Sequence, residues 1–345
     1  MHKVFPYTNA RNCLAEFLEK ALPNGIKSKS EIILSLHLRE DTLAMPNMSP
    51  DQLKDIREKI VKGDKLDDVC KELYLENTKS KRGMFRVLAR THLNRSGINH
   101  VSMGHFDKTS CPRILNFIDT IDLEQDAEKI QRELIANWLK FAENHRGTEF
   151  SNEGLDYNDK AYHALKTLND ASGREINCNL METNVTAPKL SKELEIDLGW
   201  CRIVSGIMTG LNYLNFREWD LYDQVSKTDL SYENIHKLIK ECQKNVSEYG
   251  YALAGSFLAD LGGPSFVKDD THVKACMYAI SDNLDTPEKR VKAVIESAHS
   301  VGVQPRILDK IMYIAGSGNL YLIGVKLKDS QSIKKRFIEE LTKML

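Results

Sequence analysis

Apolar residues recur every three or four positions along most of this chain, and this helical periodicity constrains its fold more than any other feature. Between residues 50 and 75 the apolar positions follow one buried helical face on each side of a Gly63-Asp64 turn. The same spacing recurs over 127–144, 232–245, 287–300 and 330–345. Thr286-Pro287 has the form of a capped helix start. Because alternation of apolar and polar residues is nowhere long enough to seed a sheet, the sequence predicts an all-α protein.

A stretch rich in Asn, Gly and Thr interrupts this pattern between about Glu143 and Pro188. It predicts an N-terminal helical domain, 1–150, and a C-terminal domain, 180–345. A chain of 345 residues with 41% hydrophobic residues can bury one large core or two modest ones. Its apolar runs are far shorter than the roughly 20 residues of a membrane helix. Since no secretory signal is visible either, we expect a protein of the cytoplasm.

The seven cysteines are scattered along the chain without close pairs. An odd number of dispersed cysteines favours reduced thiols over a disulfide framework or a four-cysteine metal cluster. His100, His105 and Cys111 lie near one another in sequence, but their spacing matches no familiar metal site and a fourth ligand is missing. We therefore expect neither a metal nor another cofactor.

The segment 246–280 carries the pattern with the most chemical content. A predicted helix ends at Gly262-Gly263-Pro264, a short extended link follows, and a second helix begins at Asp270-Thr271. A carboxylate is thereby placed at a helix N-terminus, directly after a loop that contains proline. Such an aspartate is, on its own, more often a helix cap than a catalytic group.

This arrangement resembles the helix-hairpin-helix (HhH-GPD) DNA glycosylase superfamily. In that family a hairpin, a helix and a proline-bearing loop lead to an aspartate in a V-D-x-H or V-D-T-H context, and the D-T-H of Asp270 to His272 matches it. Leu261 and Pro264 also stand where the family has an apolar residue and a proline. The segment 298–318 is similar to the helix pair that closes the same domain. The resemblance implies an HhH-GPD core preceded by an N-terminal helical extension.

The resemblance further implies that Asp270 is a catalytic carboxylate. Cleavage of an N-glycosidic bond builds positive charge on the deoxyribose, which a fixed anion stabilises. The same carboxylate can orient or deprotonate the attacking water, once the base has been rotated out of the duplex. Family members with an additional lyase activity carry a lysine nineteen positions before the aspartate, where this chain has Tyr251. The resemblance therefore implies a monofunctional enzyme that leaves an abasic site.

Four further residues are candidates for the substrate pocket: Tyr251, Asn212, Tyr213 and His272. Asn212 and Tyr213 belong to a segment where the family places helices that form the pocket wall, and their polar groups suit the edge of a base. Tyr251 is either a pocket wall or part of the core. His272 is expected to orient neighbouring backbone rather than to transfer protons.

The family hairpin usually reads L-P-G-V-G and holds a DNA phosphate through its backbone amides. The corresponding segment here, 245–250, has one glycine where two are expected and Glu248 at its tip. Ser247 and Gly250 are the candidate phosphate contacts in this remodelled hairpin.

A second candidate for DNA contact is the run 79–95, which contains no acidic residue. Arg82, Arg86 and Arg90 follow one another at four-residue spacing, so that on a helix they share one face. Such a face can follow DNA phosphates, although a solvated helix face is an equally good interpretation. Local basic residues are needed because the formal net charge of −1 gives no overall attraction to DNA.

The sequence thus predicts a monofunctional DNA glycosylase that acts on double-stranded DNA with a flipped base. The large N-terminal part suggests a specialised substrate, such as a bulky modified base of the kind that some phages carry, in repair or in defence. Three alternatives remain open: a non-catalytic nucleic-acid-binding module on the same scaffold, a glycosylase-derived enzyme that alters bases without excising them, and an all-α interaction protein unrelated to DNA.

Overall fold

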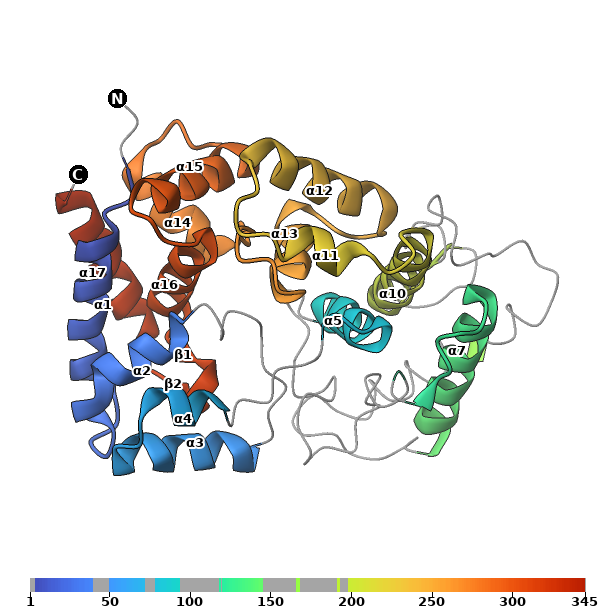
Figure 1. Ribbon diagram of the computed structural model, residues 1–345, viewed down its shortest axis with the longest axis horizontal. Helices are drawn as coiled ribbons and strands as arrows, with labels where there is room; N and C mark the ends of the chain where they lie inside the picture. Colours follow the sequence, from blue (N-terminus) through green and yellow to red (C-terminus); the bar gives the residue numbers. More distant parts are fainter. Residues whose placement is uncertain are drawn as a thin grey trace. The chain divides into compact units, whose positions relative to one another are not determined.

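The computed structural model describes residues 4–39, 50–71, 78–93, 118, 120–144, 166–167, 191–192 and 198–344. Almost all regular structure in these residues is helical (Figure 1). The exception within the described ranges is an antiparallel pair of two-residue strands, β1 (Asn319–Leu320) and β2 (Val325–Lys326). The all-α prediction is confirmed.

The starts of several helices coincide with local sequence signals. The helices are α1 (Tyr7–Ala21), η1 (Lys27–Lys29), α2 (Ser30–His37), α3 (Pro50–Lys62), α4 (Leu66–Lys71), α5 (Lys81–Leu93), α7 (Ala127–Asn144), α10 (Leu198–Phe216), α11 (Leu221–Val225), α12 (Tyr232–Asn245), α13 (Tyr251–Asp260), α14 (Thr271–Ile280), α15 (Pro287–Ser300), α16 (Pro305–Ser317), η3 (Tyr321–Ile323) and α17 (Ser330–Lys343). Helix α15 is one example: Thr286 Oγ1 accepts a hydrogen bond from the backbone N–H of Lys289 at 3.3 Å, and Pro287 fills the first helical position.

The chain forms two compact units that are not consecutive halves of the sequence. Unit 1 comprises Met1–Glu76, Val225–Ile239 and Leu258–Leu345, and unit 2 comprises Asn77–Gln224 and Lys240–Phe257. This division differs from the predicted one into 1–150 and 180–345. The physical reason is that the apolar face of α1 is buried against α16 and α17, so the first helix completes the core of the last ones (Figure 1).

The core of unit 1 includes a buried histidine that joins α2 to η3. The Nδ1–H of His37 donates to the Ile33 carbonyl at 2.8 Å, and Nε2 accepts the backbone N–H of Leu322 at 3.2 Å. Burial lowers the pKa of His37 to about 4, so the ring is neutral at physiological pH. His37 therefore holds two elements together rather than titrating near neutrality.

The core of unit 2 is built on the contact between α5 and α10. Gly206 and Gly210, one turn apart on α10, lie against His92 and Leu88, and a Cβ at either glycine would overlap these side chains. The His92 ring in turn stacks on Tyr249 with ring centroids 4.5 Å apart. Small residues at this spacing allow the two helices to approach closely.

No described helix combines the length and the apolar character that a bilayer span needs. This agrees with the short apolar runs of the sequence.

Candidate functional site

Asp270 lies at the start of α14, after the glycine-proline bend that the sequence predicts. Gly262 ends the preceding helix with a φ of 108°, in the left-handed region that favours glycine. A Cβ at Gly263 would overlap the Phe266 ring, so this position also requires a residue without a side chain. The link that follows buries Phe266 and Val267 completely. The bend and its buried link therefore fix where α14 begins.

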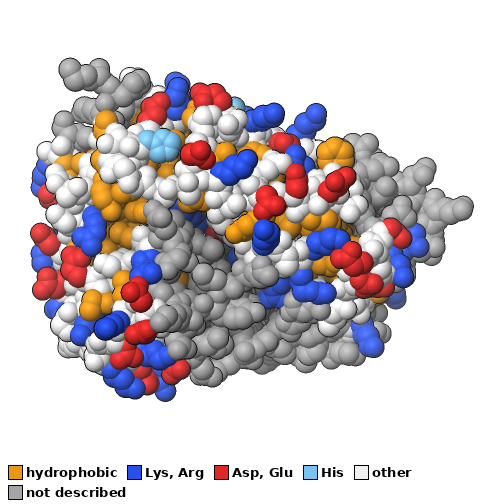
Figure 2. All heavy atoms as spheres, viewed as in Figure 1, with side chains coloured by type: hydrophobic (Ala, Val, Ile, Leu, Met, Phe, Trp, Pro, Cys, Tyr) orange, Lys and Arg blue, Asp and Glu red, His pale blue; other side chains and the backbone are white. Residues whose placement is uncertain are grey.

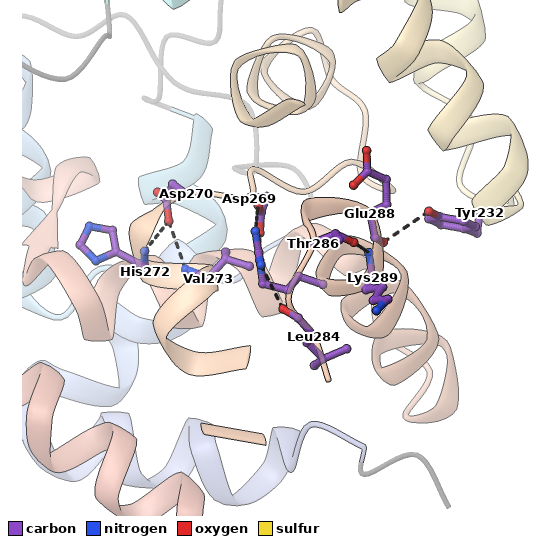
Figure 3. A network of polar contacts seen from close by, with 10 residues as sticks. Tyr232, Asp269, Asp270, His272, Val273, Leu284, Thr286, Glu288 and Lys289 are labelled. Atoms are coloured by element: carbon purple, nitrogen blue, oxygen red, sulfur yellow. Dashed lines mark hydrogen bonds and ion pairs between the residues drawn. The ribbon is translucent and has the colours of Figure 1, made fainter. Parts of the chain in front are cut away.

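The two carboxylate oxygens of Asp270 have different surroundings (Figure 3). Oδ1 accepts the backbone N–H groups of His272 at 2.7 Å and Val273 at 3.1 Å, which caps the helix. Oδ2 accepts no hydrogen bond from any residue that the structure describes. The residue is half-exposed. One oxygen thus fixes the orientation of the carboxylate, and the other is left to bind a water molecule or a ligand.

The neighbouring Asp269 is used differently. Both of its oxygens are bound by Arg290, through Nε and Nη2 at 2.7 Å each, and both side chains are only 4% exposed. Arg290 also donates to the Leu284 carbonyl at 3.0 Å. Asp269 is therefore held in a buried ion pair, whereas Asp270 keeps an oxygen that no described residue binds.

A group of buried charged residues lies close to Asp270, which we call the α16 charge cluster: Asp260, Arg306, Asp309 and Lys310. Arg306 donates through Nη2 to Asp260 at 2.7 Å and through Nη1 to Asp309. All four residues are buried. The backbone N–H of Arg306 donates to the Pro264 carbonyl at 3.0 Å, which ties the start of α16 to the bend before Asp270.

The cluster changes the acid–base properties of its members. Burial raises the pKa of Asp309, against the opposing effect of Arg306, and the charge of Asp270 raises this pKa further. Burial lowers the pKa of Lys310 to about 7, and the charge of Arg306 reinforces this shift. A carboxyl group and an amine with pKa values displaced toward neutrality are characteristic of functional sites, although structural ion pairs also produce such shifts.

Aromatic residues surround the cluster. Lys310 Nζ lies 4.4 Å from the centroid of the Tyr321 ring. Tyr313 contacts Tyr321 and His272 edge-on, at centroid distances of 6.3 and 5.9 Å. Asn319 Nδ2 donates to the Tyr313 hydroxyl at 3.1 Å. This side of α16 therefore combines charged groups with aromatic rings.

His272, predicted to be a pocket residue with an orienting role, packs against α16. Its ring lies on Gly316, where a Cβ would overlap it, and the buried Nδ1 has no hydrogen-bond partner among the described residues. Burial lowers the pKa of His272, although Asp270 opposes this shift. His272 is therefore a packed imidazole whose neutral form is favoured.

The other three predicted pocket residues belong to unit 2, whereas Asp270 and His272 belong to unit 1. The Tyr213 hydroxyl donates to Glu241 Oε1 at 3.1 Å and accepts a weak hydrogen bond from Cys242, so it is used inside the unit 2 core. Tyr251 is buried at the start of α13, with Lys240 Nζ 5.3 Å from its ring centroid. Asn212 is half-exposed on α10. Within unit 1 the structure brings together Asp270 and His272 of the predicted set.

The predicted arginine stripe of α5 is not an exposed surface. Arg82 donates to the backbone carbonyls of Ile118 and, at 3.0 Å, Ile121. Arg90 is only 5% exposed, and Arg86 is half-exposed. Packing thus buries Arg90 and engages Arg82 with backbone carbonyls, while Arg82 and Arg86 stay half-exposed, so the three guanidinium groups are not equally accessible.

The two candidate phosphate contacts of the remodelled hairpin, Ser247 and Gly250, have different surroundings. The backbone N–H of Ser247 donates to Thr209 Oγ1 at 2.8 Å and is therefore used within unit 2. Glu248 adopts a left-handed φ of 67° and pairs with Arg202 at 3.5 Å. Gly250 is exposed just before α13. Of the two candidate phosphate contacts, Gly250 is the one whose backbone faces solvent.

The α16 charge cluster was not among the predicted site residues. Arg306, Asp309, Lys310 and Tyr313 follow the spacing i, i+3, i+4, i+7, which places them on one helical face. The resemblance to the glycosylase family predicts only a closing helix pair for this segment. Polar residues at the spacing of a buried face were the signal in the sequence that could have identified them.

The described residues contain no group of three histidine, cysteine or acidic side chains that could hold a metal ion. His100, His105 and Cys111 lie outside the described residues. Comparisons with known protein families, with curated proteins and with solved structures found no match.

Proposed function

We propose that this chain is a monofunctional DNA glycosylase, which hydrolyses the N-glycosidic bond of a damaged or modified base in double-stranded DNA. The observation that carries the proposal is the exposure and hydrogen bonding of the Asp270 carboxylate. Its carboxylate is half-exposed, held in one orientation by two backbone N–H groups, and keeps an oxygen that no described residue binds.

This geometry suits the stabilisation of a sugar cation. As the base departs, positive charge develops on the deoxyribose ring, and an anion held in place beforehand need not reorganise during the reaction. Oδ2 of Asp270 can face the sugar or accept a proton from the attacking water. The N-terminus of α14 is a favourable location for this negative charge.

The basic residues around α14 give the proposed enzyme a means of holding DNA. Lys268 precedes Asp270 by two residues, and the charges of Lys334 and Lys268 both contribute to the lowered pKa of His272. Both lysines are half-exposed. On the face drawn in Figure 2, basic and acidic side chains are interspersed, so DNA binding would depend on such local positive charge. We assign the phosphate contacts to this region rather than to Arg82 and Arg90.

The proposal is tested on duplex oligonucleotides that carry damaged or modified bases. After incubation with the protein, hot alkali cleaves the strand at any abasic site, and the products are resolved by gel electrophoresis. Wild type is expected to produce strand scission, and Asp270→Asn to lower its rate by about 100-fold or more. Asp282→Asn, which changes an exposed loop carboxylate of the same unit, is the matched control.

Two results would contradict the proposal. If wild type binds the duplexes without producing abasic sites, the non-catalytic binding module is supported instead. If Asp270→Asn and Asp282→Asn cleave as fast as wild type, Asp270 is only a helix cap.

A further inference from the structure

The α16 charge cluster contains an amine for which the proposed chemistry of Asp270 has no use. Lys310 is only 5% exposed, and no carboxylate of a described residue lies within ion-pairing distance of its Nζ. Its close neighbour is the Tyr321 ring, 4.4 Å from Nζ. Lysines are seldom buried without an anionic partner, because an unpaired buried ammonium is costly.

The cluster explains why Lys310 has no ion pair. Both nearby carboxylates, Asp260 and Asp309, are bound by Arg306. Burial and the positive charge of Arg306 then act together to lower the pKa of Lys310 to about 7. At neutral pH a substantial fraction of Lys310 is therefore the free amine, whereas exposed lysines are almost entirely protonated.

Two further polar groups, one in this cluster and one in the aromatic ring beside it, have no hydrogen-bond partner among the described residues. They are the buried Tyr321 hydroxyl and the buried Arg306 Nε–H. Both are donors, and burial raises the pKa of Tyr321, so its hydroxyl keeps its proton at neutral pH. Tyr321 is itself half-exposed, whereas Lys310 is 5% exposed. A neutral amine next to unused donors suits a carbonyl group, whose carbon accepts the amine and whose oxygen accepts a hydrogen bond.

We propose that Lys310 is a nucleophilic amine that condenses with the carbonyl group of a small aldehyde. The neutral Nζ adds to the carbonyl carbon while the carbonyl oxygen gains a proton, which gives a carbinolamine. Loss of this hydroxyl as water leaves a C=N bond in place of C=O, so one aldehyde and one amine give one imine and one water without oxidation or reduction. The Tyr321 hydroxyl donates to the oxygen that leaves. The inference depends on neither Asp270 nor DNA.

The test uses the full chain with glycolaldehyde as the probe. Sodium cyanoborohydride reduces any imine to a stable secondary amine, and mass spectrometry of peptides then locates and quantifies the modification. At neutral pH we expect Lys310 to be modified at least about 10-fold faster than Lys274, an exposed lysine of α14. The Lys310 rate should rise through about pH 7 and then level off, while the Lys274 rate continues to rise with pH.

Two variants separate a reactive amine from a structural one. Tyr321→Phe removes only the hydroxyl and is expected to slow modification of Lys310 while leaving Lys274 unchanged. Lys310→Met should abolish the labelled peptide with unchanged helicity by circular dichroism. The proposal is overturned if wild-type Lys310 stays unmodified while Lys274 reacts, a result that needs no variant to fold. An unchanged Lys310 rate in Tyr321→Phe would overturn the role of the hydroxyl.

Discussion

Helices α5 and α16 both carry arginines that lie close to other segments of their own unit, but the partners of these arginines differ. In α5, Arg82 donates to the backbone carbonyls of Ile118 and Ile121. In α16, Arg306 binds the carboxylates of Asp260 and Asp309. The first arrangement satisfies neutral acceptors that cannot titrate. The second engages both carboxylates and leaves the neighbouring Lys310 without an ion pair.

This comparison shows that the effect of a packed arginine depends on whether its acceptors can titrate. A guanidinium on backbone carbonyls fixes the position of a segment and changes little else. Burial moves the pKa values of the amine and of Asp309 toward neutrality, and a guanidinium that occupies the two carboxylates reinforces the shift of the amine while it opposes that of Asp309. The variants that follow test whether the ion-paired arginines of unit 1 and the backbone-bound arginine of unit 2 differ in this way.

The largest expected effect concerns the other buried arginine pair of unit 1. Asp269→Asn leaves Arg290 buried without its carboxylate, and we expect a loss of about 3–5 kcal/mol in the free energy of unfolding. Asp270→Asn should cost less than about 1 kcal/mol, because asparagine also caps helices. Urea denaturation measures both. Equal losses would show that the two neighbouring carboxylates do not differ as described.

Lys310→Met is expected to stabilise the protein, by roughly 1–4 kcal/mol near neutral pH, since it removes a buried amine that lacks an ion pair. The pKa of Lys310 falls from 10.5 to about 7 on folding, so the unfolded chain binds a proton that the folded chain releases between these values. Wild-type stability therefore rises with pH across this window, and the penalty is complete below about pH 7. The advantage of Lys310→Met should shrink toward about pH 10 in denaturation curves. An advantage independent of pH would contradict the lowered pKa.

Arg82→Gln is expected to lower the free energy of unfolding by about 2 kcal/mol, because two backbone carbonyls lose a charged donor. The salt dependence of DNA binding should stay unchanged. A variant with unchanged stability and a salt slope reduced by about one would show instead that Arg82 contacts phosphate.

At mildly acidic pH, the smallest expected effect is the pH response of His37. Its pKa falls from 6.5 to about 4 on folding, so the unfolded chain binds a proton in this window that the folded chain does not. The stability that this neutral ring provides is complete above about pH 6.5 and is lost as the pH falls toward 4, with a loss of about 1 kcal/mol at about pH 5.5. In His37→Gln the unfolding free energy should change less over this range. If wild type and His37→Gln lose the same unfolding free energy between pH 6.5 and 4, the acid sensitivity does not come from His37.

Local signals in the sequence identified much of the helical structure. The segments 127–144, 232–245 and 287–300 coincide with α7, α12 and α15, and Gly63 separates α3 from α4 as expected. The bend at Gly262 and the start of α14 were also predicted. Caps, glycine-proline stops and periodicity act over a few residues, so they can be read without knowledge of the rest of the fold.

The orientation of polar helix faces could not be predicted in the same way. Spacing showed that Arg82 and Arg90 share a face, but only the tertiary structure shows that this face is largely occupied. The polar stripe on α16 also follows one helical face, and there Arg306, Asp309 and Lys310 are buried. The exposure of each of these two helix faces depends on segments far away in the sequence. The grouping of α1 with α17 in unit 1 depends on such segments as well.

The central claim is that the unbound oxygen of Asp270 enables a base to leave its sugar. Mass spectrometry of the free bases released from DNA that carries a panel of modified bases tests this most directly. We expect wild type to release one free base and leave an abasic site in the strand, and Asp270→Asn to release none above background. DNA that is bound but keeps every base, unchanged or chemically altered, would contradict the account.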